Sequence, residues 1–457
     1  MTFLKIKKPY AGKYHVQIFD FYILRFILVL LKNNFTMKKF FYTSFILLTI
    51  AAITFIVMSA KKKEAAVPEL KDRNLNIGLQ SEWLNTKEAV AGLLEKLRAN
   101  PDDQKARLQL AMAYIQEGRI TGDHAYYDEA SLKLLQQLLE KEPQNFDALC
   151  CKATVQLSQH HFQDGKNTAD LAVKINPNSA FVYGILCDAN LELGYYDEAI
   201  KMADKMNATR PDARSYARVS YIREILGDYK GSIEAMKLAT TSGYPGLEQS
   251  EWTRCQLGKL YETVGDTAKA MQQYSTSLAY RENYPYALAG LGRISKEKKD
   301  YKNAISYFEK AQTMITDYAF GDELTDLYLL NGESGKSVEN AQKVIVQLQQ
   351  HANTDDGNPD KGHYADKELA YAFLKINKPD QALECALREY NRRPENIEAN
   401  ETLAWCYFQK NNVPDAVKYI DKALRYNSLN PILLERAVAI YEKNGDAKKV
   451  ESLKKHL

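Results

Sequence analysis

Side chains of types that could form a metal or catalytic site occur throughout this sequence, but most lack the partners that such a site needs. His160 and His161 are adjacent imidazoles, the residue type that most often binds transition metals. No third ligand stands near them in the sequence, and they fall in a turn between two expected helices. We therefore interpret the pair as solvated turn residues.

Two other segments resemble parts of ligand-binding loops. Gly335-Lys336-Ser337 ends like a phosphate-binding loop, but that loop also requires a glycine where Leu330 stands and a strand before it. The acidic segment 355–360 has Ala352 and Thr354 where a calcium loop needs oxygen ligands. We predict a turn between helices for the first segment and a polar insert, residues 353–362, for the second.

Motifs for catalysis are absent from the sequence: no Gly-x-Ser-x-Gly, His-Glu-x-x-His or nucleotide fingerprint occurs. Six cysteines fall inside expected helices at positions that suit small apolar residues, without zinc-type spacing. They are Cys150, Cys151, Cys187, Cys255, Cys385 and Cys406. We interpret them as buried thiols and predict a non-enzymatic protein with no cofactor and no metal.

The elements that position these side chains are set by a repeat. Pro143, Pro177, Pro211 and Pro245 stand 34 residues apart, and each closes a segment with the apolar spacing of helices. Gly194 divides one such segment into two helices. A fixed period of this length indicates stacked helical hairpins, each of which buries its apolar face against the next.

The repeat resembles the tetratricopeptide repeat, which has a small residue and aromatics in its first helix, and alanines, an aromatic and a proline in its second. Matching positions include Leu257, Gly258, Tyr261, Gly265, Ala270 and Tyr274; Leu288, Gly292, Tyr301, Ala304, Phe308 and Ala311; and Leu403, Ala404, Tyr407, Ala416, Ile420 and Ala423. The resemblance covers residues 78–457. It implies an all-α, right-handed α-solenoid of about nine to ten antiparallel helix pairs.

Some segments depart from the repeat. Residues 119–125 read as an insertion between the two helices of the first full unit. Residues 81–99 read as a lone second helix that caps the array, and Lys448, Lys449, Lys454 and Lys455 make the last helix polar. Polar ends keep a solenoid soluble.

The resemblance also implies a binding surface. In similar proteins the exposed side of the first helices lines a concave groove that accepts an extended peptide or a partner helix. Helical phase places seven side chains on that side: Tyr221, Lys259, Arg293, Asp326, Tyr371, Trp405 and Phe408. The Lys and Asn cluster with which chaperone-binding members hold a carboxylate is not found here.

The N-terminal part of the chain differs in composition. Residues 1–36 read as an extension preceding a second start at Met37, and 61–77 as a polar linker. Between them, 37–60 contain the uncharged run 40–60, long enough for a transmembrane anchor, while cleavage as a signal peptide before Ala60 stays open. We expect a single-pass or exported protein of a membrane or periplasm, in a bacterial cell envelope.

Charge narrows the choice of partners. Residues 1–63 hold ten lysines and Arg25 against Asp20 alone, so the array itself is mildly acidic and lacks the basic face of a nucleic-acid binder. The sequence therefore predicts a scaffold for protein partners, with a membrane contact through residues 40–60. An alternative is an envelope factor that binds glycan or cell wall through aromatic side chains of the groove.

Overall fold

The computed structural model describes residues 42, 44–52, 54, 68–74, 76–352 and 362–457, which fall into two compact units, Met1–Pro68 and Glu69–Leu457. In the first unit the described residues between 42 and 54 are helical. Parts of three predicted segments lie outside the described residues. They are all of 1–36, both ends of the run 40–60, and residues 353–361 of the insert predicted at 353–362. Within the described part of the chain, no helix combines the length and apolar character that crossing a membrane requires.

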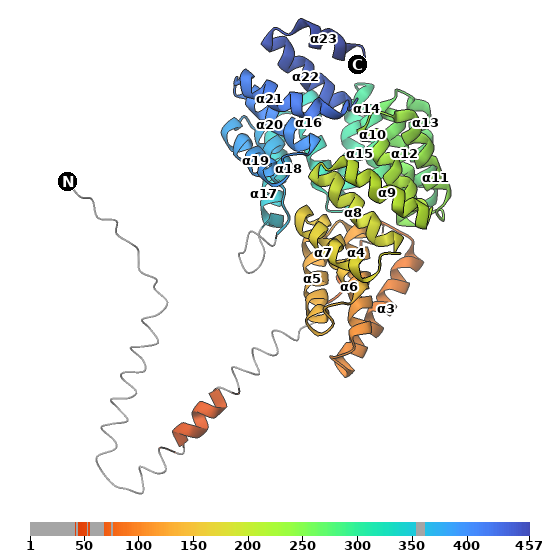
Figure 1. Ribbon diagram of the computed structural model, residues 1–457, viewed down its shortest axis with the longest axis vertical. Helices are drawn as coiled ribbons and strands as arrows, with labels where there is room; N and C mark the ends of the chain where they lie inside the picture. The colour runs from red at the N-terminus through yellow and green to blue at the C-terminus, as the bar shows by residue number, and fades with distance from the viewer. Residues whose placement is uncertain (1–41, 43, 53, 55–67, 75, 353–361) are drawn as a thin grey trace, which may run out of the picture. The chain divides into compact units, whose positions relative to one another are not determined.

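The second unit consists of helices, with no strand among its described residues (Figure 1). They are α3 (Gln80–Ala99), α4 (Gln104–Thr121), α5 (His124–Lys141), α6 (Phe146–Ser158), α7 (Phe162–Ile175), α8 (Ala180–Leu193), α9 (Tyr196–Thr209), α10 (Ala213–Ile225), α11 (Tyr229–Thr241), α12 (Glu248–Thr263), α13 (Thr267–Tyr280), α14 (Pro285–Glu297), α15 (Tyr301–Met314), α16 (Tyr318–Leu330), α17 (Ser334–Ala352), α18 (Asp366–Lys375), α19 (Pro379–Arg392), α20 (Ile397–Gln409), α21 (Val413–Ala423), the short 3₁₀ helix η1 (Leu424–Tyr426), α22 (Pro431–Asn444) and α23 (Ala447–Lys454). From α4 onward they pair into ten antiparallel hairpins, which confirms the predicted all-α solenoid.

Each hairpin is punctuated by the same chemistry. First helices end at residues with left-handed backbone, for example Gly194 with φ 84° after α8. Several second helices start at an aspartate whose carboxylate accepts a backbone N–H: Asp228 caps α11, Asp266 caps α13 and Asp300 caps α15. These turns are therefore fixed both by a residue with positive φ and by a side-chain acceptor.

Between hairpins the core is built from glycines and aromatic rings. The ring of Tyr274 on α13 lies against Gly258 of α12 and Gly290 of α14. A Cβ at Gly258 would come within 2.6 Å of this ring, and one at Gly290 within 2.4 Å. Only glycine leaves room for a buried tyrosine between two first helices, and this close packing fixes the angle between hairpins.

The six cysteines lie in this core. All six are buried and free, which confirms the prediction that they are buried thiols. Burial raises the pKa of Cys150, Cys255 and Cys406 to about 12. Their thiols therefore stay protonated at neutral pH.

Successive turns of the superhelix touch each other, which the sequence did not indicate. Contacts across this line, called here the seam, join residues that are mostly 199 to 205 positions apart, or about six 34-residue repeats. The contacts occur at five places: Glu82 with Arg281, Thr121 with Thr316, His160 and His161 with residues 362–364, residues 191–196 with 393–397, and Gly227 with Asn427 and Leu429. In most open solenoids a repeat contacts only its neighbours in sequence, so the seam adds a second set of contacts.

The start of the array is anchored at the seam by a buried ion network. The guanidinium of Arg73 contacts Glu82 at 2.7 Å and also pairs with Glu117, while Arg281 Nη1 lies 2.9 Å from Glu82 Oε2. The side chains of Arg73, Glu117 and Arg281 are each 1% exposed. The described residues of 69–77, which the sequence assigns to the polar linker, therefore pack against the array, because Arg73 pairs with Glu82 of α3 and Glu117 of α4.

The expected insertion at 119–125 is not a loop. Helices α4 and α5 are 18 residues each, and only Gly122 and Asp123 separate them. The extra residues lengthen both helices, and Gly122, with φ 71°, closes the turn against Thr316 across the seam. The lone helix predicted at 81–99 is present as α3.

Candidate interaction channel

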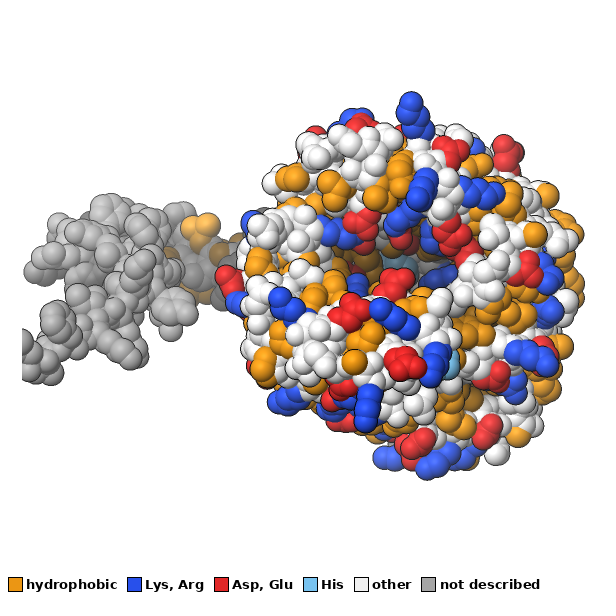
Figure 2. Space-filling view, turned by 90° about the horizontal axis from the view of Figure 1, so that it is seen from above, with side chains coloured by type: hydrophobic (Ala, Val, Ile, Leu, Met, Phe, Trp, Pro, Cys, Tyr) orange, Lys and Arg blue, Asp and Glu red, His pale blue; other side chains and the backbone are white. Residues whose placement is uncertain are grey.

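The first helices of the hairpins form the inner wall of the array. Neighbouring first helices such as α6 and α8, α12 and α14, or α18 and α20 contact each other directly, while the second helices lie outside them. Viewed along its long axis, the array surrounds a central opening edged by Lys, Arg, Asp and Glu side chains (Figure 2). We call the space inside this wall the channel. The seam closes the channel wall at the five places given above.

The seven side chains predicted for the groove lie on consecutive first helices. Tyr221 is on α10, Lys259 on α12, Arg293 on α14, Asp326 on α16, Tyr371 on α18, and both Trp405 and Phe408 are on α20. They do not converge on one pocket. They are spread along the inner wall, one or two for each hairpin.

Ion pairs join several neighbouring first helices along this wall. They are Asp188–Arg218 at 2.5 Å, Glu262–Arg293 at 2.9 Å, Lys296–Glu323 at 2.8 Å, Asp326–Lys375 at 3.0 Å, Lys367–Glu398 at 2.7 Å and Glu401–Arg436 at 2.8 Å. Partly buried pairs of this kind are costly to break, because the remaining charge is left without a partner. The wall is therefore polar but largely neutralised by its own residues.

Arg293, one of the predicted groove residues, is part of this framework. Its guanidinium donates to both oxygens of Glu262, at 2.9 and 3.0 Å, and to the Tyr274 hydroxyl at 3.0 Å. Burial opposes the charge of Arg293, but the hydrogen bonds and charge of Glu262 raise its pKa above the ordinary value. Arg293 thus positions the core ring of Tyr274 as well as facing the channel.

Two more of the residues predicted for the groove are held by other side chains of the wall. Asp326 is held by Lys375, and the Tyr371 hydroxyl receives a hydrogen bond of 2.6 Å from Arg436 and lies 3.0 Å from Thr402. These side chains help to hold hairpins together. They present their remaining surface to the channel.

Lys259 and Tyr221 are the predicted residues with most freedom to meet a ligand. Lys259 is exposed and makes no close ion pair among the described residues, although its charge favours the ionised forms of Glu224 and Glu398. Tyr221 is 40% exposed, and burial of its hydroxyl in the channel, together with Glu192 and Glu398, raises its pKa well above the ordinary value. A cation and a phenol therefore stand on neighbouring helices without fixed partners in the wall.

The aromatic pair on α20 is partly covered. Trp405 and Phe408 stack on each other with ring centroids 5.0 Å apart and planes 21° apart. The Arg436 guanidinium lies 5.4 Å from the Trp405 ring. One face of each ring is therefore used within the protein.

A cluster of charges from both superhelical turns was missed by the sequence. Glu192 of α8 pairs across the seam with Arg393 at 2.8 Å, near the Lys367–Glu398 pair of the second turn. The charge of Lys367 lowers the pKa of Glu398 to about 2 despite burial. The Lys367–Glu398 spacing follows the repeat period and could have been found, whereas the Glu192–Arg393 contact depends on the superhelix closing on itself.

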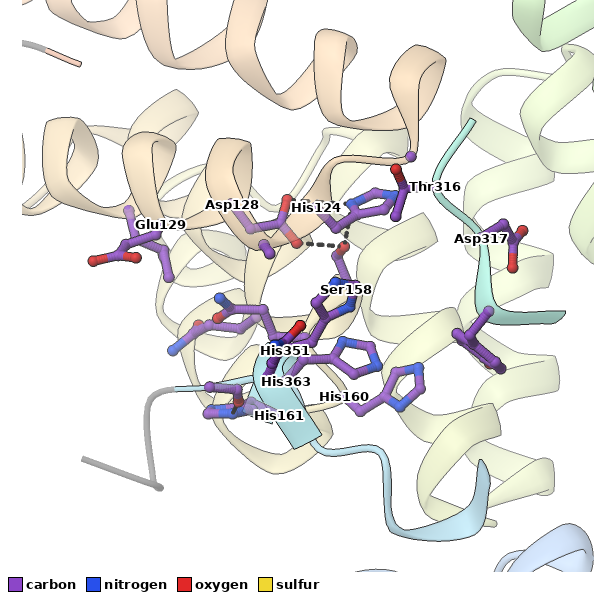
Figure 3. Close-up of a pocket in the computed structure, with 18 of the residues that line it drawn as sticks. His124, Asp128, Glu129, Ser158, His160, His161, Thr316, Asp317, His351 and His363 are labelled. Carbon is purple, nitrogen blue, oxygen red and sulfur yellow. Dashed lines mark hydrogen bonds and ion pairs between the residues drawn. The ribbon is translucent and has the colours of Figure 1, made fainter. Parts of the chain in front are cut away.

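A cavity of about 800 Å³ lies at the seam beside the channel wall. Five imidazoles line it: His124, His160, His161, His351 and His363 (Figure 3). His161 is 7% exposed, so the interpretation of His160 and His161 as solvated turn residues is wrong. Their turn is covered by residues 362–364, which come from the next superhelical turn, and no local pattern reveals such a contact.

A serine, a histidine and an aspartate meet in this cavity. The Ser158 hydroxyl donates to Asp128 Oδ2 at 2.8 Å, and His124 Nδ1 lies 3.2 Å from Ser158 Oγ and 3.4 Å from Asp128 Oδ1. A nucleophilic relay requires the hydroxyl and the carboxylate at opposite ring nitrogens, whereas here both approach Nδ1. The arrangement ties α5 to α6 and is not a catalytic triad. Within the described residues, no three His, Cys, Asp or Glu side chains converge as a metal site.

Comparison with known proteins agrees with this geometry. Family models described as tetratricopeptide repeat match residues 285–318 and 367–431. A search of the curated proteins finds no match.

Several solved structures are similar to parts of this chain. A thermophilic tetratricopeptide repeat protein of Thermus thermophilus is 21% identical, with 40% of this chain and 98% of that chain covered and a TM-score of 0.35. The human IFIT1 dimer with PPP-AAAA is 14% identical, with 76% and 88% covered and a TM-score of 0.42. PilF of Pseudomonas aeruginosa is 16% identical, with 45% and 90% covered and a TM-score of 0.35. At such identities and TM-scores the likeness identifies neither an activity nor a partner.

Proposed function

We propose that this array of tetratricopeptide repeats is a non-enzymatic scaffold that holds a segment of a partner protein inside its channel. The observation that carries the proposal is the inner wall itself, where unpaired Lys259 and Tyr221 stand among charges that neutralise one another. Mixed aromatic and charged side chains on a concave surface suit recognition of a polypeptide segment.

The seam limits what kind of segment can reach this wall. Because successive turns touch, the wall is approached along the superhelix axis and not from the side. A narrow segment, either extended or a single helix, meets this condition, and a folded domain does not. Lys259 favours an acidic side chain or a carboxylate terminus on the partner.

Capture by the full-length chain from the native membrane fraction tests the proposal. Lys259→Glu reverses the unpaired charge in the channel, and we expect it to reduce recovery of the specific partner at least roughly tenfold. Lys302→Glu makes the same change at an exposed lysine of the outer helix α15 and should leave recovery unchanged. Equal recovery by both variants, with helicity unchanged in each, would contradict binding in the channel.

We further propose that the run 40–60 attaches the array to a bacterial membrane, or exports it to the periplasm or cell envelope. What supports this is its uncharged sequence between the lysines at residues 38–39 and those at 61–63. Mapping the first residue of the mature protein in fractionated cells tests it. A full-length chain found only in the soluble cytoplasmic fraction would contradict both attachment to the membrane and export.

A further inference from the structure

The histidine cavity sits where the two superhelical turns are joined. Five of the seven histidines of the chain line it, on α5, on the turn between α6 and α7, at the end of α17 and just before α18. In sequence these positions belong to hairpins about six repeats apart. The seam at this place is therefore made largely of imidazole rings.

Backbone carbonyls of the second turn accept hydrogen bonds from two of these rings. His160 Nδ1 donates to the Tyr364 carbonyl at 2.7 Å, and His161 Nε2 donates to the Gly362 carbonyl at 2.6 Å. In return, the Tyr364 N–H donates to the Gln159 carbonyl at 3.0 Å. These three bonds hold residues 362–364 against the turn after α6.

Ring contacts complete the joint. The centroids of His160 and His363 are 4.2 Å apart, and His161 stacks on Tyr364 at 4.0 Å with planes 16° apart. His160 also stacks on Phe162 at 5.2 Å. Neutral rings pack well at these distances, whereas two imidazolium rings in contact repel each other.

The groups around the two contacting imidazoles oppose their protonation. His160 faces the cations Lys367 and Arg393, while the Tyr364 carbonyl and the acid Glu389 favour its charged form; burial, followed by Lys367, lowers its pKa to about 4. His363 faces His160, His351, His124 and the single acid Glu368, and burial followed by His160 lowers its pKa to about 3. Both rings are thus neutral in the closed seam at neutral pH.

His124 has the opposite environment. Burial disfavours its charge, but the hydrogen bond and charge of Asp128, with a smaller effect of Asp317, raise its pKa. On acidification His124 gains a proton before His160, His351 and His363, and it adds a positive charge to the cavity that His363 faces. This order of protonation therefore weakens the joint as the pH falls.

We propose that this joint is an acid-released clasp, in which protonation of His160 and His363 separates residues 362–364 from the turn after α6 and opens the channel wall at this place, while the rest of the seam stays closed. The chemistry is a proton taken from solvent by each ring, with no bond made or broken apart from hydrogen bonds. The consequence for partner access rests on the proposed function, because an open wall admits a segment from the side. The release itself does not depend on any partner.

The sign of the effect follows from the pKa values. With the seam open, both rings are solvated and titrate near 6.5, so the open form binds more protons than the closed form below that pH. The seam is most stable above about pH 6.5, and its stability falls as the pH drops toward the lowered values of the closed form. Between pH 7 and pH 5 the ratio of open to closed should rise roughly 500-fold.

Amide hydrogen exchange of the full-length chain, without partner, measures this ratio. The Tyr364 amide reports the clasp, and the Ile397 amide, which donates to the Tyr196 hydroxyl at 2.9 Å, reports a part of the seam without histidine. After correction for intrinsic rates, protection of Tyr364 should fall steeply between pH 7 and pH 5 while that of Ile397 changes little. Parallel behaviour of the two amides in the wild-type chain would overturn the clasp.

A double variant provides the control. His160→Asn keeps a side-chain N–H donor and tolerates the φ of 61° at this position, and His363→Gln keeps a polar side chain that does not titrate. Protection of Tyr364 in this variant should no longer depend on pH. An unchanged dependence would also overturn the proposal, and either result is independent of whether Lys259 contributes to partner capture.

Discussion

At the scale of single residues, the side chains of the inner wall divide into those that hold the array together and those free to bind. Charge and helical phase predict that Lys259 and Arg293 face the groove, and the structure places both on first helices. Only the contacts separate them, because Arg293 is held by Glu262 and Tyr274 while Lys259 has no such partner among the described residues. Phase identifies a face of a helix but not whether a charge on it is already paired.

A glycine pair allows the core packing to be tested at this scale. Gly290→Ala would place a Cβ 2.4 Å from the buried ring of Tyr274, and we expect it to destabilise the array by about 1–3 kcal/mol. Gly92→Ala on α3 meets no atom within 4 Å and should stabilise its helix by about 0.5–1 kcal/mol. Urea unfolding followed by circular dichroism measures both, and a tolerated Gly290→Ala would refute the tight packing around Tyr274.

At the scale of elements, the hairpins follow closely from the sequence. Period, glycine and proline predict helix pairs, and the structure has ten of them in the region the sequence assigns to repeats. The boundaries are set by aspartate caps that recur at the start of second helices, as at Asp228, Asp266 and Asp300. The expected loop at 119–125 failed because extra residues between good helix formers extend the helices instead.

The cap of α15 is a direct test of this punctuation. Asp300 accepts the Asn303 N–H at 3.3 Å and the Asn303 side-chain amide at 2.7 Å, so Asp300→Ala should cost about 1 kcal/mol of stability. Asp204→Ala removes an exposed aspartate from the middle of α9 and serves as the matched control. Thermal unfolding should show a lower midpoint for the cap variant alone, and equal midpoints would contradict the assigned role of the cap.

At the scale of the whole molecule, the sequence predicts a solenoid but not its closure on itself. Local patterns determine how one hairpin stacks on the next, while the seam depends on the small rotation per repeat summed over about six repeats. The burial of His161 and the pairing of Glu192 with Arg393 follow from that summed rotation. No sequence pattern within a single repeat reveals this summed rotation.

Gly194 offers the most direct test of whether successive superhelical turns contact each other at the seam. Its φ of 84° disfavours any side chain, and a Cβ there would lie 2.1 Å from the backbone carbon of Glu395 across the seam. Gly445 ends α22 with nearly the same φ, 80°, but faces open space. We expect Gly445→Ala to cost about 1 kcal/mol locally, whereas Gly194→Ala should also part the seam.

Two measurements on this pair distinguish backbone strain from loss of closure. In Gly194→Ala the Ile397 amide should exchange faster and the radius of gyration should increase, while in Gly445→Ala both should remain as in the wild-type chain. Identical behaviour of the two variants would mean that the seam does not exist in solution.

The seam also fixes the number of repeats, because each of its contacts requires the same number of repeats between the two partners. Deleting the hairpin of α12 and α13, which lies between the two partners of each of these seam contacts, would shift all of them by a repeat, so that Glu192 would no longer face Arg393 and Gly194 would no longer face Glu395. An open solenoid can gain or lose units and keep its remaining contacts. This array can change length without loss of register only at its two ends.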